Sequence, residues 1–115
     1  MEKFNDSLRG YGHPIFKRDS FTCRYCGRDH SSFEMWRFLT VDHLLPKNWP
    51  DKEEREKAKW KVTACSFCNT VRNRTRYDIK PGITPAAIVK MKKKEIDKAT
   101  ALYQDFWEKE VNKGK

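Results

Sequence analysis

The chain has 115 residues, of which 37% are hydrophobic and 36% charged, and its formal net charge is +9. This length predicts a single domain, and so polar a composition excludes a large apolar core. It contains no run of about 18 apolar residues, which excludes a membrane-spanning helix. The 25 Lys and Arg against 16 Asp and Glu favour a polyanionic partner, because cations set against phosphates release condensed counterions.

The first elements of the chain are predicted to be a short helix and a strand. The helix lies around residues 12–19, and the strand runs from Met35 to Val41, where aromatic and β-branched residues are enriched. Pro46 ends this strand or begins the turn after it. The opening segment "MEKFNDSLRGYGHP" lacks the apolar stretch of a secretory signal, so we expect a cytoplasmic protein.

Three further elements are expected in the middle of the chain. The charged segment "DKEEREKAKW", residues 51–60, suits a short solvated helix to which we assign no chemistry. The segment "KVTAC", residues 61–65, is a second short strand candidate. Residues 66–76 have the spacing of a short helix that starts at the second of two cysteine pairs.

The four cysteines form two CxxC pairs, and none is left over. Two thiolates separated by two residues in a turn reach one tetrahedral ion, and Gly27 lets the backbone turn tightly after the first pair. A cytosolic chain keeps its thiols reduced, which favours metal ligands over disulfides. A closed four-cysteine site has no open position for a substrate, so we expect a structural zinc ion held by Cys23, Cys26, Cys65 and Cys68.

Three polar residues near the expected zinc site are candidates for chemistry. Asp42 and His43 end the first predicted strand, and Asn69 lies on the helix that begins at the second cysteine pair. Carboxylate and amide oxygens are hard ligands that suit Mg²⁺ or Mn²⁺, and a neutral imidazole suits removal of a proton from water. Because adjacent strand residues point to opposite faces, Asp42 and His43 need a bent backbone or a metal between them to act together.

The C-terminal segment predicts a long amphipathic helix, with Thr84 as its N-cap and Pro85 at the first helical position. This helix packs on the rest of the domain or mediates a dimer. Four lysines near its start form a solvated face or follow a phosphate backbone: Lys90, Lys92, Lys93 and Lys94. Apolar residues recur along it at three- to five-residue steps: Ile88, Met91, Ile96, Ala99, Leu102, Tyr103, Phe106 and Trp107.

Three stretches of the chain resemble the HNH endonuclease family: "FKRDSFTCRYCG", "LTVDHLLP" and "VTACSFCNTVRN". Together they cover roughly residues 15–74, about half of the chain, in the family's order and spacing. The resemblance implies an α+β fold with a small ββα-metal (HNH, His-Me finger) core over residues 1–80, stabilised by the four-cysteine zinc site. The long amphipathic helix then occupies residues 81–115, where it packs on the core or mediates dimerisation.

The resemblance also implies roles for individual residues. His43 matches the general base that activates water for attack on phosphorus, and Asp42 and Asn69 match the residues that hold one catalytic Mg²⁺ or Mn²⁺ ion. Asn73, one helical turn beyond Asn69, is a possible addition to that metal site. Three basic residues are expected to contact substrate phosphates: Arg72, Arg74 and Arg76.

One position departs from the family pattern. The family's middle Asn, which braces the loop between the two strands, falls on Trp60. Either this aromatic side chain packs in its place or another polar residue, such as Asn48, replaces it. The departure affects the expected loop geometry but leaves the base and the metal ligands present.

The function expected from these residues is metal-dependent hydrolysis of DNA phosphodiester bonds, with one strand or both cut and with little sequence specificity. The cofactors are structural Zn²⁺ and catalytic Mg²⁺ or Mn²⁺, the partner is DNA rather than a membrane, and the chain is a monomer or a homodimer through its C-terminal helix. A catalytically inactive zinc-knuckle module that binds nucleic acid is the alternative, and a protein-interaction domain is a third reading. The presence of Asp42, His43 and Asn69 together favours the nuclease.

Overall fold

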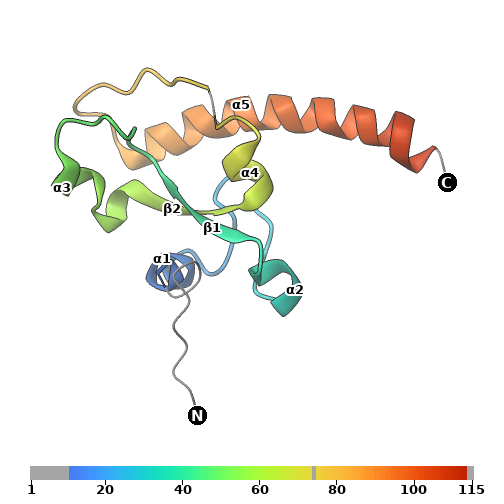
Figure 1. Cartoon of the computed structure of the whole chain (residues 1–115), viewed down its shortest axis with the longest axis horizontal. Helices are drawn as coiled ribbons and strands as arrows, with labels where there is room; N and C mark the ends of the chain where they lie inside the picture. The colour runs from blue at the N-terminus through green and yellow to red at the C-terminus, as the bar shows by residue number, and fades with distance from the viewer. Residues whose placement is uncertain (1–10, 74, 114–115) are drawn as a thin grey trace, which may run out of the picture.

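The centre of the molecule, seen here in a computed structural model, is a two-stranded antiparallel sheet (Figure 1). Strand β1 spans Leu39–His43 and strand β2 spans Lys61–Cys65, and the register pairs Leu39 with Cys65 and His43 with Lys61. The structure describes residues 11–73 and 75–113. The second strand therefore lies at the predicted residues, and the chain is a small α+β domain with a long C-terminal helix.

The first strand begins later than the sequence predicted, because residues 33–36 form a short helix, α2 (Phe33–Trp36). The Ser32 side chain caps this helix by accepting a hydrogen bond from the Met35 N–H at 3.3 Å. Phe33, Met35 and Phe38 are all exposed, so these apolar side chains are not buried against a face of the sheet. The prediction of a strand over residues 35–38 was wrong, since a local cap outcompeted β propensity there.

Helix α1, His13–Arg18, confirms the first predicted element and covers one face of the sheet (Figure 1). Arg18, the last residue of the helix, and Asp19, which follows it, connect the helix by hydrogen bonds to the second strand and to the turn before it. Arg18 donates to the backbone oxygens of Ala58 and Lys61 at 2.9 and 2.7 Å, and the Asp19 carboxylate accepts the Thr63 N–H at 3.0 Å. Burial alone would raise the pKa of Asp19, but the hydrogen bonds from Arg18 and Thr63 lower it.

The connection between the strands contains helix α3 (Lys52–Arg55) and a single 3₁₀ turn, η1 (Ala58–Trp60). Trp60, at the position where the sequence departs from the HNH pattern, is buried, and its indole N–H donates to Glu54 at 3.0 Å. Arg55 donates from Nε to the backbone oxygens of Leu45 and Pro46 at 3.1 and 3.0 Å. An indole packed inward and a guanidinium on two carbonyls therefore hold this loop, while Asn48 is exposed.

Helix α4, Ser66–Thr70, is shorter than the predicted helix over residues 66–76. The Thr70 hydroxyl donates back to the Ser66 carbonyl at 2.7 Å, and residues 71–73 form turns. Side-chain bonding of this kind competes with the helical backbone pattern and favours an early end. Asn73 therefore does not lie one helical turn beyond Asn69, as the sequence had suggested.

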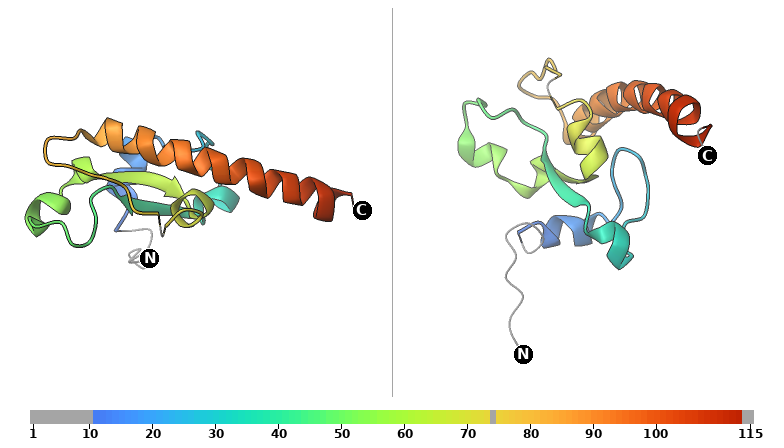
Figure 2. Two further views of the ribbon diagram at one scale, coloured as in Figure 1. Left: turned by 90° about the horizontal axis from the view of Figure 1, so that it is seen from above. Right: turned by 45° about the vertical axis from the view of Figure 1, so that its right-hand side comes forward.

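Helix α5, Pro85–Phe106, begins where predicted: the Thr84 hydroxyl accepts the Ala87 N–H at 3.2 Å, and Pro85 is the first helical residue. Its last turns, Trp107–Asn112 (η2), are π-helical. The first half of α5 packs on the sheet face opposite α1, and the second half projects beyond the rest of the molecule (Figures 1 and 2). None of the helices formed by the described residues combines the length and apolar character needed to span a bilayer.

Candidate functional site

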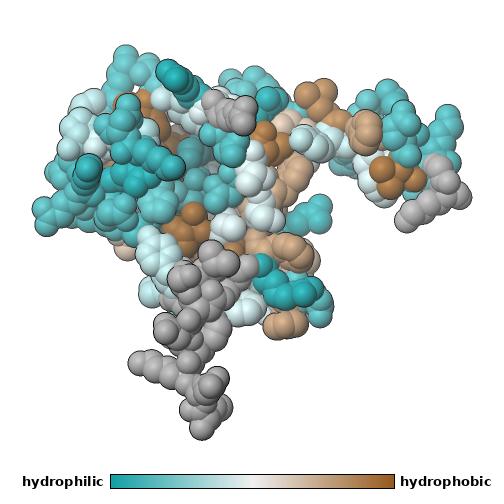
Figure 3. All heavy atoms as spheres, viewed as in Figure 1, coloured by the Kyte–Doolittle hydropathy of each residue, from teal (hydrophilic) through white to brown (hydrophobic). Residues whose placement is uncertain are grey.

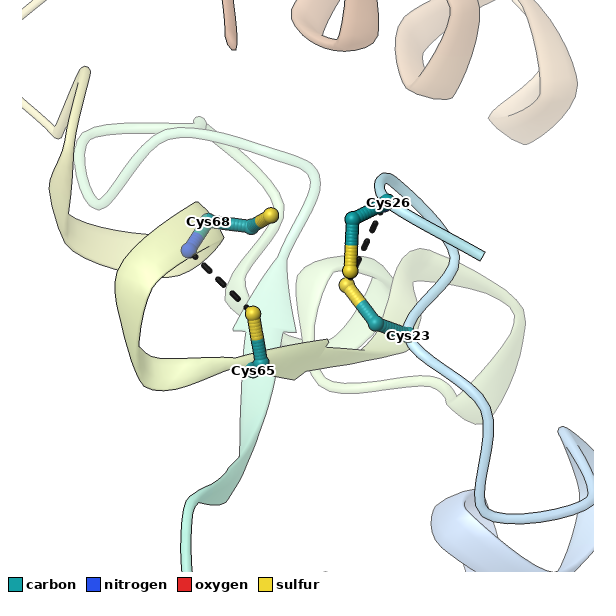
Figure 4. Close-up of side chains that lie close together, drawn as sticks. All are labelled: Cys23, Cys26, Cys65 and Cys68. Carbon is teal, nitrogen blue, oxygen red and sulfur yellow. Dashed lines mark hydrogen bonds between the residues drawn. The ribbon is translucent and has the colours of Figure 1, made fainter. Parts of the chain in front are cut away.

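The four cysteines lie together where the first loop meets the start of α4, although 38 residues separate the two pairs (Figure 4). Their Sγ atoms all fall within 4.8 Å of one another, and no disulfide joins them. Four thiolates around one zinc ion at about 2.3 Å stand about 3.8 Å apart, so only a small contraction separates this cluster from a zinc tetrahedron. Chemistry and geometry both suit a structural zinc site at Cys23, Cys26, Cys65 and Cys68.

Each CxxC pair has the local geometry of a metal knuckle. The backbone N–H of Cys26 points at Cys23 Sγ and that of Cys68 points at Cys65 Sγ, each at 3.5 Å. Gly27, with φ of 74°, makes the left-handed turn that ends the first knuckle. Hydrogen bonds from the Cys65 and Cys68 thiols lower the pKa of Cys23, and the same contacts raise the pKa of Cys65 and Cys68.

Asn69 follows the second knuckle and faces the first strand. Its amide nitrogen donates to the Thr40 hydroxyl at 2.8 Å and lies 3.5 Å from the Val41 carbonyl oxygen. The Thr40 hydroxyl donates its own proton to the Ala64 carbonyl at 2.7 Å, so it is an acceptor toward Asn69. The strand therefore holds the NH₂ group of Asn69, and among the described residues no hydrogen bond reaches its Oδ1.

Asp42 lies two residues after Thr40, on the same face of β1. One of its oxygens, Oδ2, accepts hydrogen bonds from the Tyr25 hydroxyl and from Lys92 Nζ, the latter at 3.0 Å. Among the described residues no hydrogen bond reaches Oδ1 of this carboxylate. Burial and the charge of Asp42 raise the pKa of Tyr25, which stays a proton donor.

Tyr25 and Lys92 were not predicted as site residues. Tyr25 is the second residue between the cysteines of the first knuckle, so its place inside a CxxC pair was the available signal. Lys92 was noted only as one of four lysines near the start of the last predicted helix. Its contact with Asp42 depends on how α5 crosses the sheet, which the sequence does not indicate. The two side chains of the Lys92–Asp42 ion pair are only 15% and 13% exposed, so the pair is largely shielded from water.

His43, the next residue along β1, is partly buried beside the loop between the strands. Its Nε2 atom lies 3.8 Å from a Glu56 carboxylate oxygen, and Lys61 pairs with the same carboxylate at 3.3 Å. Burial is the largest effect on this imidazole and lowers its pKa, and the nearby Arg55 charge lowers it further; Glu56 opposes them. The ring is therefore neutral near pH 7.

A single cleft of about 710 Å³ brings these side chains to a common surface. Asp42, His43, Asn69 and Asn73 all line it, although the first two are adjacent in a strand. Within this cleft Asp42 contacts Tyr25 and Lys92, whereas His43 lies beside Glu56. Five basic residues also line the cleft, against one carboxylate among the described residues: Lys47, Arg55, Arg72, Arg76 and Lys92.

Two of the three predicted phosphate contacts, Arg72 and Arg76, lie in this cleft, and Arg74 falls outside the described residues. Arg72 Nε is buried and has no hydrogen-bond partner among the residues that the structure describes. A buried guanidinium donor without an acceptor is costly, and an anion entering the cleft would satisfy it. Lys93 instead pairs with Asp97 on the exposed side of α5.

No family model matches this chain, and no curated protein and no solved structure matches it. The functional conclusion therefore rests on the cysteine cluster and on the side chains of the cleft.

Proposed function

We propose that the protein is a metal-dependent DNA endonuclease of the HNH type. The observation that carries this proposal is the cleft, where a neutral imidazole, a carboxylate and an amide lie among five basic side chains. A basic cleft attracts a phosphodiester backbone, and the other three groups are those that hydrolysis of a phosphodiester requires. The order β1, β2, α4, with the catalytic residues at the end of β1 and on α4, is the arrangement expected of a ββα-metal core.

The oxygen donors of the cleft fit a hard divalent cation, and we assign Asp42 and Asn69 as the residues that would hold Mg²⁺ or Mn²⁺. Asp42 Oδ1 accepts no hydrogen bond from the described residues, and the NH₂ group of Asn69 is held by Thr40 and Val41, so an oxygen of each is open to a ligand. Asn73, in the same cleft, is a candidate for a further oxygen ligand. The bound cation would stabilise the negative charge that develops on the phosphoryl and leaving oxygens.

His43 is the proposed general base. An imidazole that is neutral near pH 7 accepts a proton from water as the water oxygen attacks phosphorus. Glu56, 3.8 Å from Nε2, favours the tautomer with its proton on that nitrogen and leaves Nδ1 to accept the proton. Tyr25 holds the Asp42 carboxylate in place through the hydrogen bond from its hydroxyl to Oδ2.

The basic residues are proposed to position the substrate. Arg72 and Arg76 would hold backbone phosphates at the α4 side of the cleft, and Lys47 and Arg55 would do so at the loop side. Lys47, Arg72 and Arg76 lie on turns and loops rather than on a helix or β-ribbon that could enter a groove and read base edges. Cleavage is therefore expected to depend weakly on sequence.

The test is cleavage of supercoiled plasmid by wild-type protein and by His43→Ala, with Mg²⁺ or Mn²⁺ added to zinc-loaded protein. Loss of the base is expected to slow cleavage by about 10²- to 10⁴-fold without changing the zinc content or the circular dichroism spectrum. His13→Ala, which removes an exposed imidazole from α1, is the matched control. Equal cleavage by wild type and His43→Ala would refute this mechanism, as would full activity in EDTA.

A second candidate is a zinc-stabilised nucleic-acid-binding module whose cleft does not bind a divalent cation. The Lys92–Asp42 ion pair favours it, because an ammonium group already neutralises the carboxylate. Salt-dependent DNA binding, without cleavage in any divalent cation, would support this candidate over the nuclease.

A further inference from the structure

The apolar stripe of α5 continues past the part of the molecule that covers it. Ile88, Ile96 and Ala99 are buried at 0%, 4% and 3% exposure. Leu102 and Phe106 continue the same face of the helix at three- and four-residue steps and are 67% and 61% exposed. A helix face that stays apolar beyond its own core requires another surface to cover it.

The exposed part of this stripe belongs to the projecting end of the helix, residues 101–113, which we call the α5 arm. Figure 3 shows hydrophobic side chains on the arm and on the surface beneath it, toward α2. The arm carries five large apolar side chains that are 42–67% exposed: Leu102, Tyr103, Phe106, Trp107 and Val111.

A shallow groove of about 480 Å³ adjoins the arm and shares its apolar character. Met35, Phe38 and Phe67 line it and are each between 37% and 52% exposed. Phe67 also packs edge-on against Tyr103 of the arm, with ring centroids 5.4 Å apart. The arm and the groove therefore form one continuous apolar patch, convex along the arm and hollowed beside it.

We propose that this patch is the interface of a two-fold symmetric homodimer, in which the α5 arm of each copy lies in the groove of the other. A two-fold interface requires a patch that complements itself, and an arm beside a groove on one face has that shape. The eight large side chains of the patch, each about half exposed, present on the order of 700 Å² of apolar area. A stable dimer buries about 800 Å² per partner, so the patch is the right size.

Charge separates this interface from the surface that would meet nucleic acid. Residues 101–113 carry three acidic side chains and two basic ones, whereas the whole chain has a net charge of +9. The lining of the groove includes Arg28, together with Lys93 and Asp97, which pair with each other. The net charge of the arm is −1, and its acidic side chains can pair with Arg28 of a second copy. Dimerisation does not depend on the proposed catalysis, because the interface excludes the cleft.

The experiment is sedimentation equilibrium of the zinc-loaded full chain from about 1 to 100 µM. The wild type, 13.7 kDa per chain, is expected to reach the mass of a dimer in this range, and Phe106→Glu or Leu102→Glu is expected to raise the dissociation constant at least about tenfold. Ala101→Glu adds the same charge on the opposite, exposed face of the arm and is expected to dimerise as the wild type does.

Cleavage assays and zinc content, measured on the same samples, separate this result from failure of the cleft or of the fold. A wild-type chain that stays monomeric throughout the range would overturn the proposal. A dimer that survives both Leu102→Glu and Phe106→Glu unchanged would also overturn it, since the interface would then lie elsewhere.

Discussion

The cysteine cluster and the cleft both use residues from the two knuckles, but they differ in whether their metal-binding groups already have a charged partner. The first knuckle contributes Tyr25, a buried residue that donates to Asp42 of the cleft, and the second knuckle is followed by Asn69, which lines the cleft. In the cluster, four soft donors face one another, and the hydrogen bonds from other groups that reach their sulfurs are backbone N–H contacts. In the cleft, Lys92 already pairs with the Asp42 carboxylate. The fold gathers the cluster around a position for a cation, whereas the Mg²⁺ or Mn²⁺ proposed for the cleft would have to compete with Lys92 for Asp42.

Removal of a cluster ligand is expected to have the largest effect. Cys68→Ser takes one thiolate from the proposed zinc site, and metal binding of this kind contributes about 10 kcal/mol or more to the folding of small zinc domains. We therefore expect the variant to lose zinc and its cooperative thermal unfolding, measured by elemental analysis and circular dichroism. Ser66→Ala, inside the same knuckle but without a thiol, is the control. A stable Cys68→Ser protein would show that the core folds without the cluster.

Asn69→Asp separates the two parts of the asparagine amide. The new carboxylate keeps an oxygen ligand but loses the NH₂ group that donates to Thr40, and it faces two acceptors instead. We expect the free energy of unfolding to fall by about 1–3 kcal/mol. Denaturant unfolding measures this change, with the exposed Asn73→Asp as the control. Unchanged stability in Asn69→Asp would mean that the contact with Thr40 is not needed to place the side chain.

Lys92→Met tests the competition between this lysine and the metal ion directly. Removal of the ammonium group takes a competing positive charge away from Asp42, whose Oδ2 keeps the hydrogen bond from Tyr25, so Mn²⁺ should bind about tenfold more tightly, equivalent to about 1.4 kcal/mol. Titration of zinc-loaded protein followed by the Mn²⁺ electron paramagnetic resonance signal gives the affinity without any cleavage assay. Lys93→Met, which removes an exposed lysine paired with Asp97, should change little. Weaker Mn²⁺ binding in Lys92→Met would show that the lysine supports the metal site rather than competing with it.

The smallest expected effect is on pH dependence. Burial and Arg55 lower the pKa of His43, and the proposed base acts only when neutral, so cleavage should fall as the pH drops through a midpoint below about 6.5. Glu56 raises this pKa, and Glu56→Gln should therefore move the midpoint to still lower pH. Rates of plasmid cleavage at fixed metal concentration give both profiles. A midpoint above 6.5 would contradict the assignment of the base to this imidazole.

Much of the fold was predictable because local signals were strong. The second strand and the Thr84 cap with Pro85 appear as predicted, since each depends on residues close in sequence. The two CxxC segments also meet as predicted, although 38 residues separate them, because four cysteines in two such pairs indicate one shared metal site. The first strand was placed too early, because the Ser32 cap made a helix from residues with high β propensity. Helix α4 was predicted too long: it ends at Thr70, whose hydroxyl donates to the Ser66 carbonyl, and residues 71–73 form turns.

Some residues of the candidate site were named from the sequence, but Tyr25, Lys92 and the contacts among the side chains were not. Asp42, His43 and Asn69 share a cleft, as expected from the motif, but nothing local connects Lys92 to Asp42 across 50 residues. The role of Tyr25 depends on the approach of the first knuckle to β1, which the cysteine cluster sets. Sequence periodicity also placed the whole apolar stripe on one face of α5 without showing that the core stops at Ala99.

Cys68 and Asn69 are consecutive residues on one short helix, the first pointing into the cluster and the second toward β1. An insertion or deletion in this turn would rotate both side chains at once, by about 100° per residue. We therefore expect α4 to tolerate substitution at its exposed position Thr70 but no change of length between β2 and Asn69.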